Sequence, residues 1–303
     1  MCGIAGVMLE GGGEVGNLLI SMLKGLQHRG LDSAGVALYK KETPPEDEYL
    51  IRVFTKDVVG ALSKVATAIA LTGGDIRSIK INAVKGYGFD TYIIKSDPAS
   101  LPRIVEGINS TGLSKVLSLG RKMEIIKDTT TADELERRFE ISSFLGSHAI
   151  GHVRFSTESC VDILHAHPFQ SFSYLDMALV HNGQITNYWK CRERLERKGV
   201  SFQTENDSEL IVHYLVERFR EGMSLADALK SSVIDLDGPF SYVFSTSEEV
   251  GMVRDKLGLR PLVVSEGRNI RALASEESSL RIVGGSGRIR NLRPGEVLVW
   301  RLN

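Results

Sequence analysis

Short apolar segments, separated by turns rich in glycine or proline, run through most of the chain. Near the start, residues 2–9 and 34–39 are continuous apolar runs and predict buried strands. Apolar positions between them recur every three to four residues, which predicts a helix over 17–27 with Asn17 as its cap. Residues 42–48 are polar and contain two prolines, so they predict a loop.

The middle of the chain predicts a small insertion with its own alternation of strands and helices. A helix is predicted at 61–71 and ends at the glycines that follow it. Further strands and helices are predicted, in order, at residues 87–95, 97–109, 123–127 and 131–144. We therefore predict an inserted β-α-β-α module over approximately 75–145, within a domain that spans residues 2–303.

The second half of the chain predicts strands in consecutive runs. These strands are expected at residues 149–155, 177–181, 240–246, 250–254, 261–265, 271–275, 281–283 and 296–301. Two amphipathic helices are expected near 187–198 and 207–220. Runs of strands without strict strand–helix alternation favour an α+β fold with antiparallel sheets.

Composition narrows the class of protein further. The 303 residues are 42% apolar and 25% charged, with a formal net charge of −1, which argues against a general nucleic-acid binder. Three cysteines provide no disulfide framework and fit a reducing compartment. We find no apolar run near the roughly 20 residues of a membrane helix and no signal-peptide pattern, so we expect a cytoplasmic protein without membrane contact.

Cys2 combines two reactive groups once Met1 is removed. Its α-amine would then be free, with a reference pKa of about 8, beside a thiol with a reference pKa of about 8.5. An amine that titrates near neutrality is a suitable general base for its own nucleophile. A single cysteine near a terminus is more often an ordinary buried residue, so the other polar clusters of the chain decide its interpretation.

Five further polar clusters adjoin predicted strands or helices. They are HRGLDSAG at 28–35, GHVRFST at 151–157, HAHPF at 165–169, LVHNG at 179–183 and NDSE at 206–209. Together with MCGIAG at the start, this ordered set resembles the class II, or N-terminal-nucleophile, glutamine amidotransferases. The resemblance implies an αββα four-layer sandwich of two antiparallel sheets.

The resemblance implies a catalytic role for three residues. Cys2 is the expected nucleophile that attacks the glutamine side-chain amide and forms a thioester, with the terminal amine as base. Asn182 and Gly183 are the expected oxyanion hole, formed by a side-chain amide and a backbone N–H. An Asn-Gly pair alone is a common hairpin turn.

The resemblance also implies four substrate-binding residues. Arg154 matches the arginine that binds the glutamine α-carboxylate, for which a planar guanidinium is well suited. Asp207 matches the acid that pairs with the α-amine, although it is also placed to cap the helix beginning near Ser208. Thr157 and His167 match positions that line the glutamine pocket.

Three neighbouring residues receive no catalytic role. Arg29 and Asp32 are expected to shape the site, and Glu158 stands where some relatives have a histidine.

Two other kinds of site fit parts of the same sequence. His165 and His167 have the spacing of strand-borne metal ligands, and the nearby His152, His181 and Cys160 would complete such a set. Gly11, Gly13 and Gly16 fit the GxGxxG pattern of dinucleotide-binding loops. The order of the amidotransferase motifs accounts better for these histidines and Cys160 than a metal site does. The consecutive strands of the second half argue against a dinucleotide-binding fold. We therefore predict no metal and no cofactor in this chain, and interpret the glycines as a mobile turn.

Ammonia released from glutamine needs an acceptor site. We find no P-loop, and three cysteines cannot supply a four-cysteine cluster as well as a nucleophile. The module sequences GYGFDTYIIKSD and LSLGRKMEIIKD resemble free-standing amidotransferase subunits of archaeal-type glutamate synthases and N-methylglutamate synthases. This resemblance implies a hetero-oligomer in which a separate synthase subunit carries FMN and an iron–sulfur cluster.

Two alternative functions remain open from the sequence. One is an N-terminal-nucleophile amidohydrolase for another amide, which the pairing of Arg154 with Asp207 disfavours. The other is a non-catalytic subunit that senses glutamine, which retention of Met1 would favour.

Overall fold

The computed structural model describes residues 1–84, 86–156, 160–284 and 287–302. The chain forms two compact units. Unit 1 comprises residues 1–41, 126–171 and 177–303, and unit 2 comprises residues 42–125 and 172–176. Within the described ranges, no helix is both long enough and apolar enough to cross a membrane.

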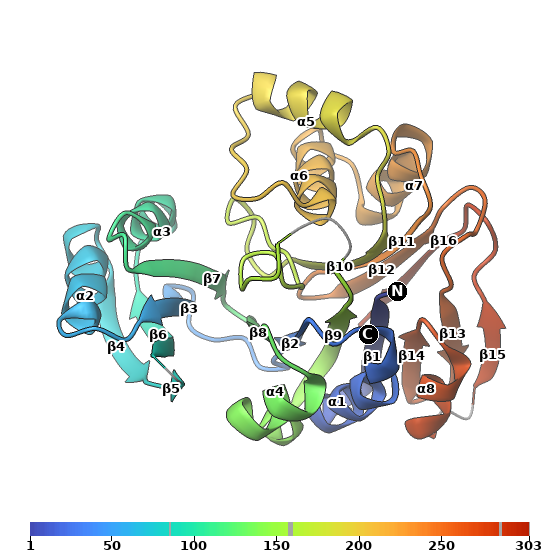
Figure 1. Cartoon of the computed structure of the whole chain (residues 1–303), viewed down its shortest axis with the longest axis horizontal. Coiled ribbons are helices and arrows are strands. Elements are labelled where there is room, and N and C mark those ends of the chain that lie inside the picture. The colour runs from blue at the N-terminus through green and yellow to red at the C-terminus, as the bar shows by residue number, and fades with distance from the viewer. Residues whose placement is uncertain (85, 157–159, 285–286, 303) are drawn as a thin grey trace. The chain divides into compact units, whose positions relative to one another are not determined.

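A seven-stranded sheet forms the centre of unit 1 (Figure 1). Its strand order is β15-β13-β14-β1-β9-β2-β8. The strands are β1 (Gly3–Gly13), β2 (Ser33–Tyr39), β8 (Met123–Asp128), β9 (Gly146–Arg154), β13 (Val263–Glu266), β14 (Ile270–Ala274) and β15 (Arg288–Asn291). The expected glycine turn is wrong, because β1 continues through the glycines and Gly13 pairs with Gly146.

Strand β9 is buried along its whole length because both of its faces are covered. Ala149 and Val153 point into the core beneath the helices. The alternate residues His148 and His152 face the second sheet, where each hydrogen-bonds a backbone carbonyl, of Thr246 and His181 respectively. Period-two alternation therefore places the polar side chains of β9 between the two sheets.

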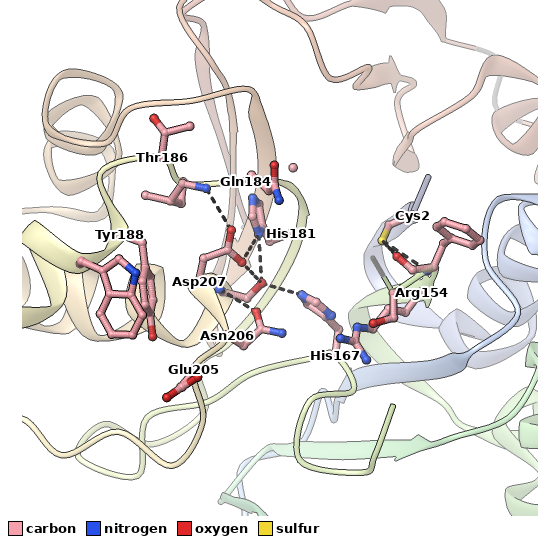
Figure 2. Close-up of a pocket in the computed structure, with 16 residues that line it drawn as sticks. Cys2, Arg154, His167, His181, Gln184, Thr186, Tyr188, Glu205, Asn206 and Asp207 are labelled. Carbon is pink, nitrogen blue, oxygen red and sulfur yellow. Dashed lines mark hydrogen bonds and ion pairs between the residues drawn. The ribbon is translucent and has the colours of Figure 1, made fainter. Parts of the chain in front are cut away.

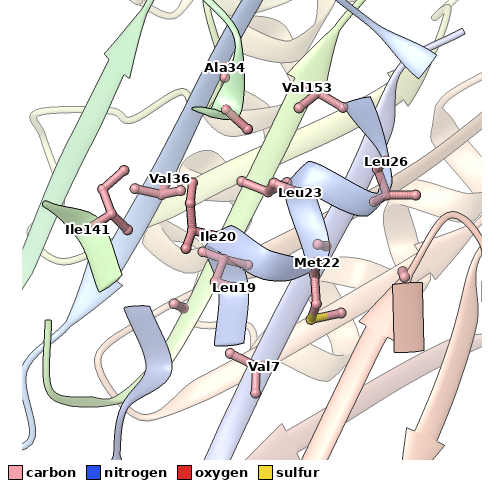
Figure 3. Close-up of a cluster of buried hydrophobic side chains, with 14 of the residues drawn as sticks. Val7, Leu19, Ile20, Met22, Leu23, Leu26, Ala34, Val36, Ile141 and Val153 are labelled. Carbon is pink, nitrogen blue, oxygen red and sulfur yellow. The ribbon is translucent and has the colours of Figure 1, made fainter. Parts of the chain in front are cut away.

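Helices cover the outer face of this sheet. They are α1 (Val15–Gly25), α4 (Ala132–Phe139) and α8 (Glu277–Ile282), with short 3-10 turns η1 (Gln27–Arg29) and η3 (Ile141–Ser143). Figure 3 shows Leu19 and Leu23 of α1 packed against Val36 and Val153 of the sheet. Glu14, rather than the expected Asn17, precedes the first turn of α1.

The second sheet of unit 1 has the order β10-β11-β12-β16 and is antiparallel throughout. Its strands are β10 (Ala178–Gly183), β11 (Phe240–Ser245), β12 (Glu249–Arg254) and β16 (Val297–Arg301). Helices α5 (Tyr188–Arg197), α6 (Asp207–Arg220) and α7 (Leu225–Asp235) pack on its outer face (Figure 1). Helices, two facing sheets and helices give the expected four-layer α+β fold.

In its described part, unit 2 contains a five-stranded sheet and two helices. It contains β3 (Glu48–Lys56), α2 (Ala61–Leu71), β4 (Asp75–Lys80), β5 (Ala83–Val84), β6 (Tyr87–Lys95), η2 (Pro98–Ser100), α3 (Leu101–Asn109) and β7 (Ser114–Gly120). Apart from the two-residue β5, which pairs with β6, the succession is β-α-β-β-α-β, and with the strand order β4-β6-β3-β7 it describes a split βαβ unit. Residues 172–176 also belong to unit 2. Asp176 in this segment holds the turn that follows β7, because its Oδ1 accepts hydrogen bonds from the backbone N–H groups of residues 121–123.

The bounds of unit 2 differ from the expected module of 75–145. The unit begins earlier, because β3 lies at the centre of its sheet. It also ends earlier, because Ala132 and Leu135 of α4 pack in the core of unit 1. The strand expected at 281–283 is also wrong, since α8 occupies most of it.

Candidate active site

Cys2 lies immediately before β1, where contacts from three distant segments hold it. Its Sγ is 3.5 Å from both the backbone N and O of Phe155. Its carbonyl oxygen accepts hydrogen bonds from Arg29 Nε at 2.9 Å and Asn182 Nδ2 at 3.2 Å. Burial raises the pKa of the thiol, while the Phe155 backbone, the chain terminus and Arg154 act in the opposite direction.

Arg154 ends β9 directly opposite the start of β2. Its Nη1 donates to the Cys160 carbonyl at 2.9 Å, and its own carbonyl accepts from the backbone N of Asp32 at 3.0 Å. The Asp32 carboxylate accepts in turn from the Ser156 backbone N at 2.6 Å. Gly30 is required at this point, because a Cβ there would lie 2.3 Å from the Arg154 carbonyl carbon. Arg29 and Asp32 thus contact the segments that hold Cys2 and Arg154.

One cavity of about 540 Å³ is lined by five of the predicted residues. This volume lies within the range of small-molecule sites. Figure 2 shows Cys2 and Arg154 on one side of the cavity and Asp207 on the other. Its described lining includes Cys2, Arg154, Phe155, Ser156, His167, His181, residues 183–186, Tyr188, Trp189 and residues 205–208.

Gly183 lies at the end of β10 and lines this cavity. Its φ is +141°, and a Cβ at this position would lie 2.1 Å from the Pro239 carbonyl oxygen. The chain therefore needs glycine here for both its conformation and its close backbone approach. The preceding Asn182 is buried, and its side chain is fixed by the hydrogen bond to Cys2.

Asp207 forms the opposite wall, and it does not cap α6. Asn206 is the cap, since its side chain accepts from the Ser208 backbone N at 2.9 Å. Asp207 Oδ2 instead accepts from the Ile185 backbone N at 3.0 Å, and Oδ1 lies 3.4 Å from His181 Nδ1. Burial opposes ionisation, but His181 and the backbone donors outweigh it and lower the pKa of Asp207. The cavity therefore contains a fixed carboxylate that suits an ammonium group.

Three histidines are buried beside the cavity. The rings of His152 and His167 stack with centroids 4.0 Å apart, and His152 Nε2 hydrogen-bonds the His181 carbonyl at 2.9 Å. Burial lowers the pKa of His152 to about 3 and that of His167 well below its ordinary value. Both rings are therefore neutral near pH 7.

Lys127 is buried behind His167. Its ammonium donates to the carbonyl oxygens of Ala166 at 2.7 Å and Pro168 at 3.2 Å, the two neighbours of His167. Burial lowers the pKa of Lys127 to about 7, against the opposing influence of Glu209 and Asp162. Lys127 thus holds the HAHPF segment from inside the protein.

The structure brings together six of the seven predicted site residues. Cys2, Arg154, His167, Gly183 and Asp207 line the cavity, and Asn182 contacts Cys2. Thr157, like Glu158, lies outside the described residues. Sequence reasoning gave no role in such a pocket to Ser208, Lys127 or Trp189, although Ser208 lies within the NDSE motif.

The alternative metal site has no support within the described part of the chain. No group of three or more His, Cys, Asp or Glu side chains there is arranged to hold a metal ion. His165 pairs with Asp162 through Nδ1 at 2.8 Å. His152 uses Nε2 to bond a backbone carbonyl.

Comparisons with known proteins show the family of the chain. Residues 152–281 match the family model of a glutamine amidotransferase domain. A Methanothermobacter thermautotrophicus protein, provisionally named a glutamine amidotransferase, is 44% identical over 309 aligned positions that cover all of both chains. The chain belongs to the glutamine amidotransferase family.

One further relative fits this family assignment, and one solved structure shares the fold. The glutamine amidotransferase-like protein GlxB of Rhizobium meliloti is 33% identical, with 99% of this chain and 98% of that protein covered. The solved glutamine phosphoribosylpyrophosphate amidotransferase of B. subtilis shares the fold, with a TM-score of 0.65 and 22% identity. That match covers 99% of this amidotransferase chain but 47% of the solved chain, so this chain spans about half the length of that enzyme.

Proposed function

We propose that this chain hydrolyses the side-chain amide of L-glutamine to glutamate and ammonia through a thioester on Cys2. The observation that carries the proposal is the single cavity in which Cys2 and Arg154 lie across from Asp207. Arg154 fits an α-carboxylate and Asp207 fits an α-ammonium group. A free α-amino acid bound between them would extend its side chain toward the thiol.

The proposed chemistry starts after removal of Met1. The α-amine of Cys2 takes the thiol proton, and the sulfur attacks the amide carbon of glutamine. The negative charge that develops on the amide oxygen is stabilised by donors at Asn182 and Gly183. The amide C–N bond then breaks, and the nitrogen takes the proton from the α-ammonium and leaves as ammonia. Water attacks the thioester, which releases glutamate and restores the thiol.

We further propose that a separate synthase subunit receives the nitrogen, in a cytoplasmic hetero-oligomer of glutamate-synthase type. The sequence resemblance of the inserted module supports this assignment. FMN and an iron–sulfur cluster would belong to that subunit.

The deciding experiment is mass spectrometry of the intact chain after incubation with a glutamine-mimicking diazoketone. We expect a chain that lacks Met1 and carries one adduct on Cys2. Cys2→Ala should carry no adduct and release no glutamate from glutamine, while its circular dichroism spectrum matches that of the wild type. Retained Met1 without an adduct would contradict the proposal and support the glutamine-sensing alternative.

A further inference from the structure

The hydroxyl group of Ser208 lies between two buried histidines. Ser208 Oγ is 2.8 Å from His167 Nε2 and 3.0 Å from His181 Nδ1. Each of the three residues is at most 5% exposed to solvent. A serine hydroxyl has one proton to donate, so these contacts restrict where the imidazole protons lie.

The distances favour one direction for the hydrogen bonds. O–H donors usually lie nearer to their acceptors, at about 2.7–2.8 Å, than N–H donors, at about 2.9–3.0 Å. The contact of 2.8 Å therefore fits the Ser208 hydroxyl donating to His167 Nε2. The contact of 3.0 Å fits His181 Nδ1–H donating to the Ser208 oxygen.

The carboxylate of Asp207 favours the same direction. Its Oδ1 lies 3.4 Å from His181 Nδ1 and accepts hydrogen bonds only. In the reverse arrangement His181 Nδ1 would point a lone pair at this carboxylate oxygen. The remaining arrangement, in which both rings donate to Ser208, would direct its hydroxyl to Asp207 Oδ1 at 3.5 Å, a longer contact.

This direction determines the form of His167. A neutral imidazole whose Nε2 accepts must carry its proton on Nδ1. That Nδ1 is buried and has no hydrogen-bond partner within the described ranges, although His167 lines the cavity. An unpaired buried donor is costly, and a bound ligand with an oxygen acceptor would satisfy it.

We propose that Ser208 is a positioning residue that fixes His167 as the neutral Nδ1–H tautomer, and that this N–H donates to an oxygen of bound glutamine. The donation to glutamine rests on the function proposed above. The tautomer of His167 concerns the protein alone and holds for any ligand of the cavity. Ser208 thereby links the orientation of Asp207, through His181, to that of His167.

The test of the tautomer is nuclear magnetic resonance of the full chain with 15N-labelled histidine. Long-range 15N–1H correlations distinguish Nδ1–H from Nε2–H rings, and His167→Gln identifies the His167 signals. We expect Nδ1–H for His167 and His181 in the wild type. In Ser208→Ala, the Nδ1–H population of His167 should fall several-fold. The cap of α6 does not depend on this hydroxyl, because Asn206 supplies it.

Ser279→Ala is the matched control. Ser279 is also a fully buried serine of unit 1, and its hydroxyl donates to the Met22 carbonyl at 3.0 Å. It should leave the histidine signals and glutamine kinetics unchanged. An Nε2–H ring at His167 in the wild type, or an unchanged tautomer in Ser208→Ala, would overturn the proposal.

Kinetics test the link to glutamine. Loss of one hydrogen bond predicts a KM for glutamine about tenfold higher in Ser208→Ala, with kcat within about twofold. A changed tautomer with an unchanged KM would overturn the donation to glutamine. If the wild type shows the assigned tautomers but hydrolyses no glutamine, the proposed function fails, while the role of Ser208 in fixing the tautomer stands.

Discussion

Asn182 donates a hydrogen bond from its side-chain amide to the carbonyl oxygen of Cys2 over 3.2 Å. The two residues are 180 positions apart in the sequence. Asn182 is the residue before the last of β10 in one sheet, and Cys2 precedes the central strand β1 of the other. The hydrogen bond therefore sets the candidate oxyanion donor and the candidate nucleophile at a fixed separation across the two sheets.

Asn182→Ala removes both this hydrogen bond and the proposed side-chain donor to the oxyanion. We expect kcat for glutamine hydrolysis to fall by about 10²–10³, the usual cost of one oxyanion donor. KM should change little, because the donor acts mainly on the transition state. Steady-state glutamate release measures both constants. Asn109→Ala is the control, since Asn109 bonds the Val116 backbone within unit 2. A kcat equal to that of the wild type would argue against this role.

Arg154→Lys tests the recognition of the α-carboxylate. A lysine keeps the charge but loses the planar pair of donors that matches a carboxylate. We expect KM for glutamine to rise by at least about tenfold, equivalent to about 1.4 kcal/mol. Arg281→Lys is the control, because Arg281 forms an exposed ion pair with Glu277. If both variants keep the KM of the wild type, another amide is the substrate.

Asp207→Asn tests the recognition of the α-ammonium group. The amide keeps similar size but loses the charge, so KM for glutamine should rise about 10- to 100-fold. The variant should also discriminate less between glutamine and its analogue without the α-amino group. Competition between the two compounds measures this difference. Asp227→Asn, at an exposed acid of α7, should retain the preference of the wild type. Equal discrimination in all three proteins would exclude Asp207 from amine binding.

Sequence patterns predict two kinds of element: helices and strands with one polar and one apolar face, and strands that are apolar throughout. The helix of residues 207–220 and the strand over 87–95 coincide with α6 and β6. Strand β3 was missed because charged residues interrupt its apolar pattern. The structure accommodates one of them, the buried Arg52, through an ion pair with Glu124. That pairing depends on a residue far along the chain, so no local pattern indicates it.

In the candidate site, too, local motifs predict some residues, while contacts between distant segments are not predicted. Motif order brought Cys2, Arg154 and Asp207 into one hypothesis, and all three line the cavity. The sequence does not decide which residue caps α6, because Asn206 and Asp207 are both suitable N-cap residues. The hydrogen bond from the Ser208 backbone N to the Asn206 side chain identifies Asn206 as the cap. The links made by Ser208 and Lys127 join segments tens of residues apart, which sequence spacing does not reveal.

Gly183→Ala tests whether the backbone at the cavity requires glycine. Gly183 has a positive φ, and an added Cβ would lie 2.1 Å from the Pro239 oxygen. Gly222→Ala is the matched control, because Gly222 has a φ of +85° with no atom within 4 Å of an added Cβ. We expect the control to lose about 1 kcal/mol of unfolding free energy through backbone strain alone. Gly183→Ala should lose more and should also lose glutaminase activity, as denaturant unfolding and glutamate release will show. Equal losses of stability would mean that the backbone at Pro239 shifts away from the added Cβ at little energetic cost.

Lys127→Met tests the energetic cost of burying an amine next to His167. Burial lowers the pKa of Lys127 from 10.5 to about 7. Between these values the unfolded chain binds a proton that the folded chain releases, so the penalty shrinks as the pH rises. From about pH 7 to 10, the unfolding free energy of the wild type should therefore increase relative to Lys127→Met by up to about 1.4 kcal/mol per pH unit.

The measurement is denaturant unfolding followed by tryptophan fluorescence. The two tryptophans, Trp189 and Trp300, both belong to unit 1, as Lys127 does. The variant also loses the hydrogen bonds to Ala166 and Pro168, but that loss shifts the curve without giving it this slope. Lys230→Met, at an exposed lysine, should show a constant difference from the wild type. A constant difference for Lys127→Met as well would mean that the buried amine stays charged throughout, held by Glu209 and Asp162.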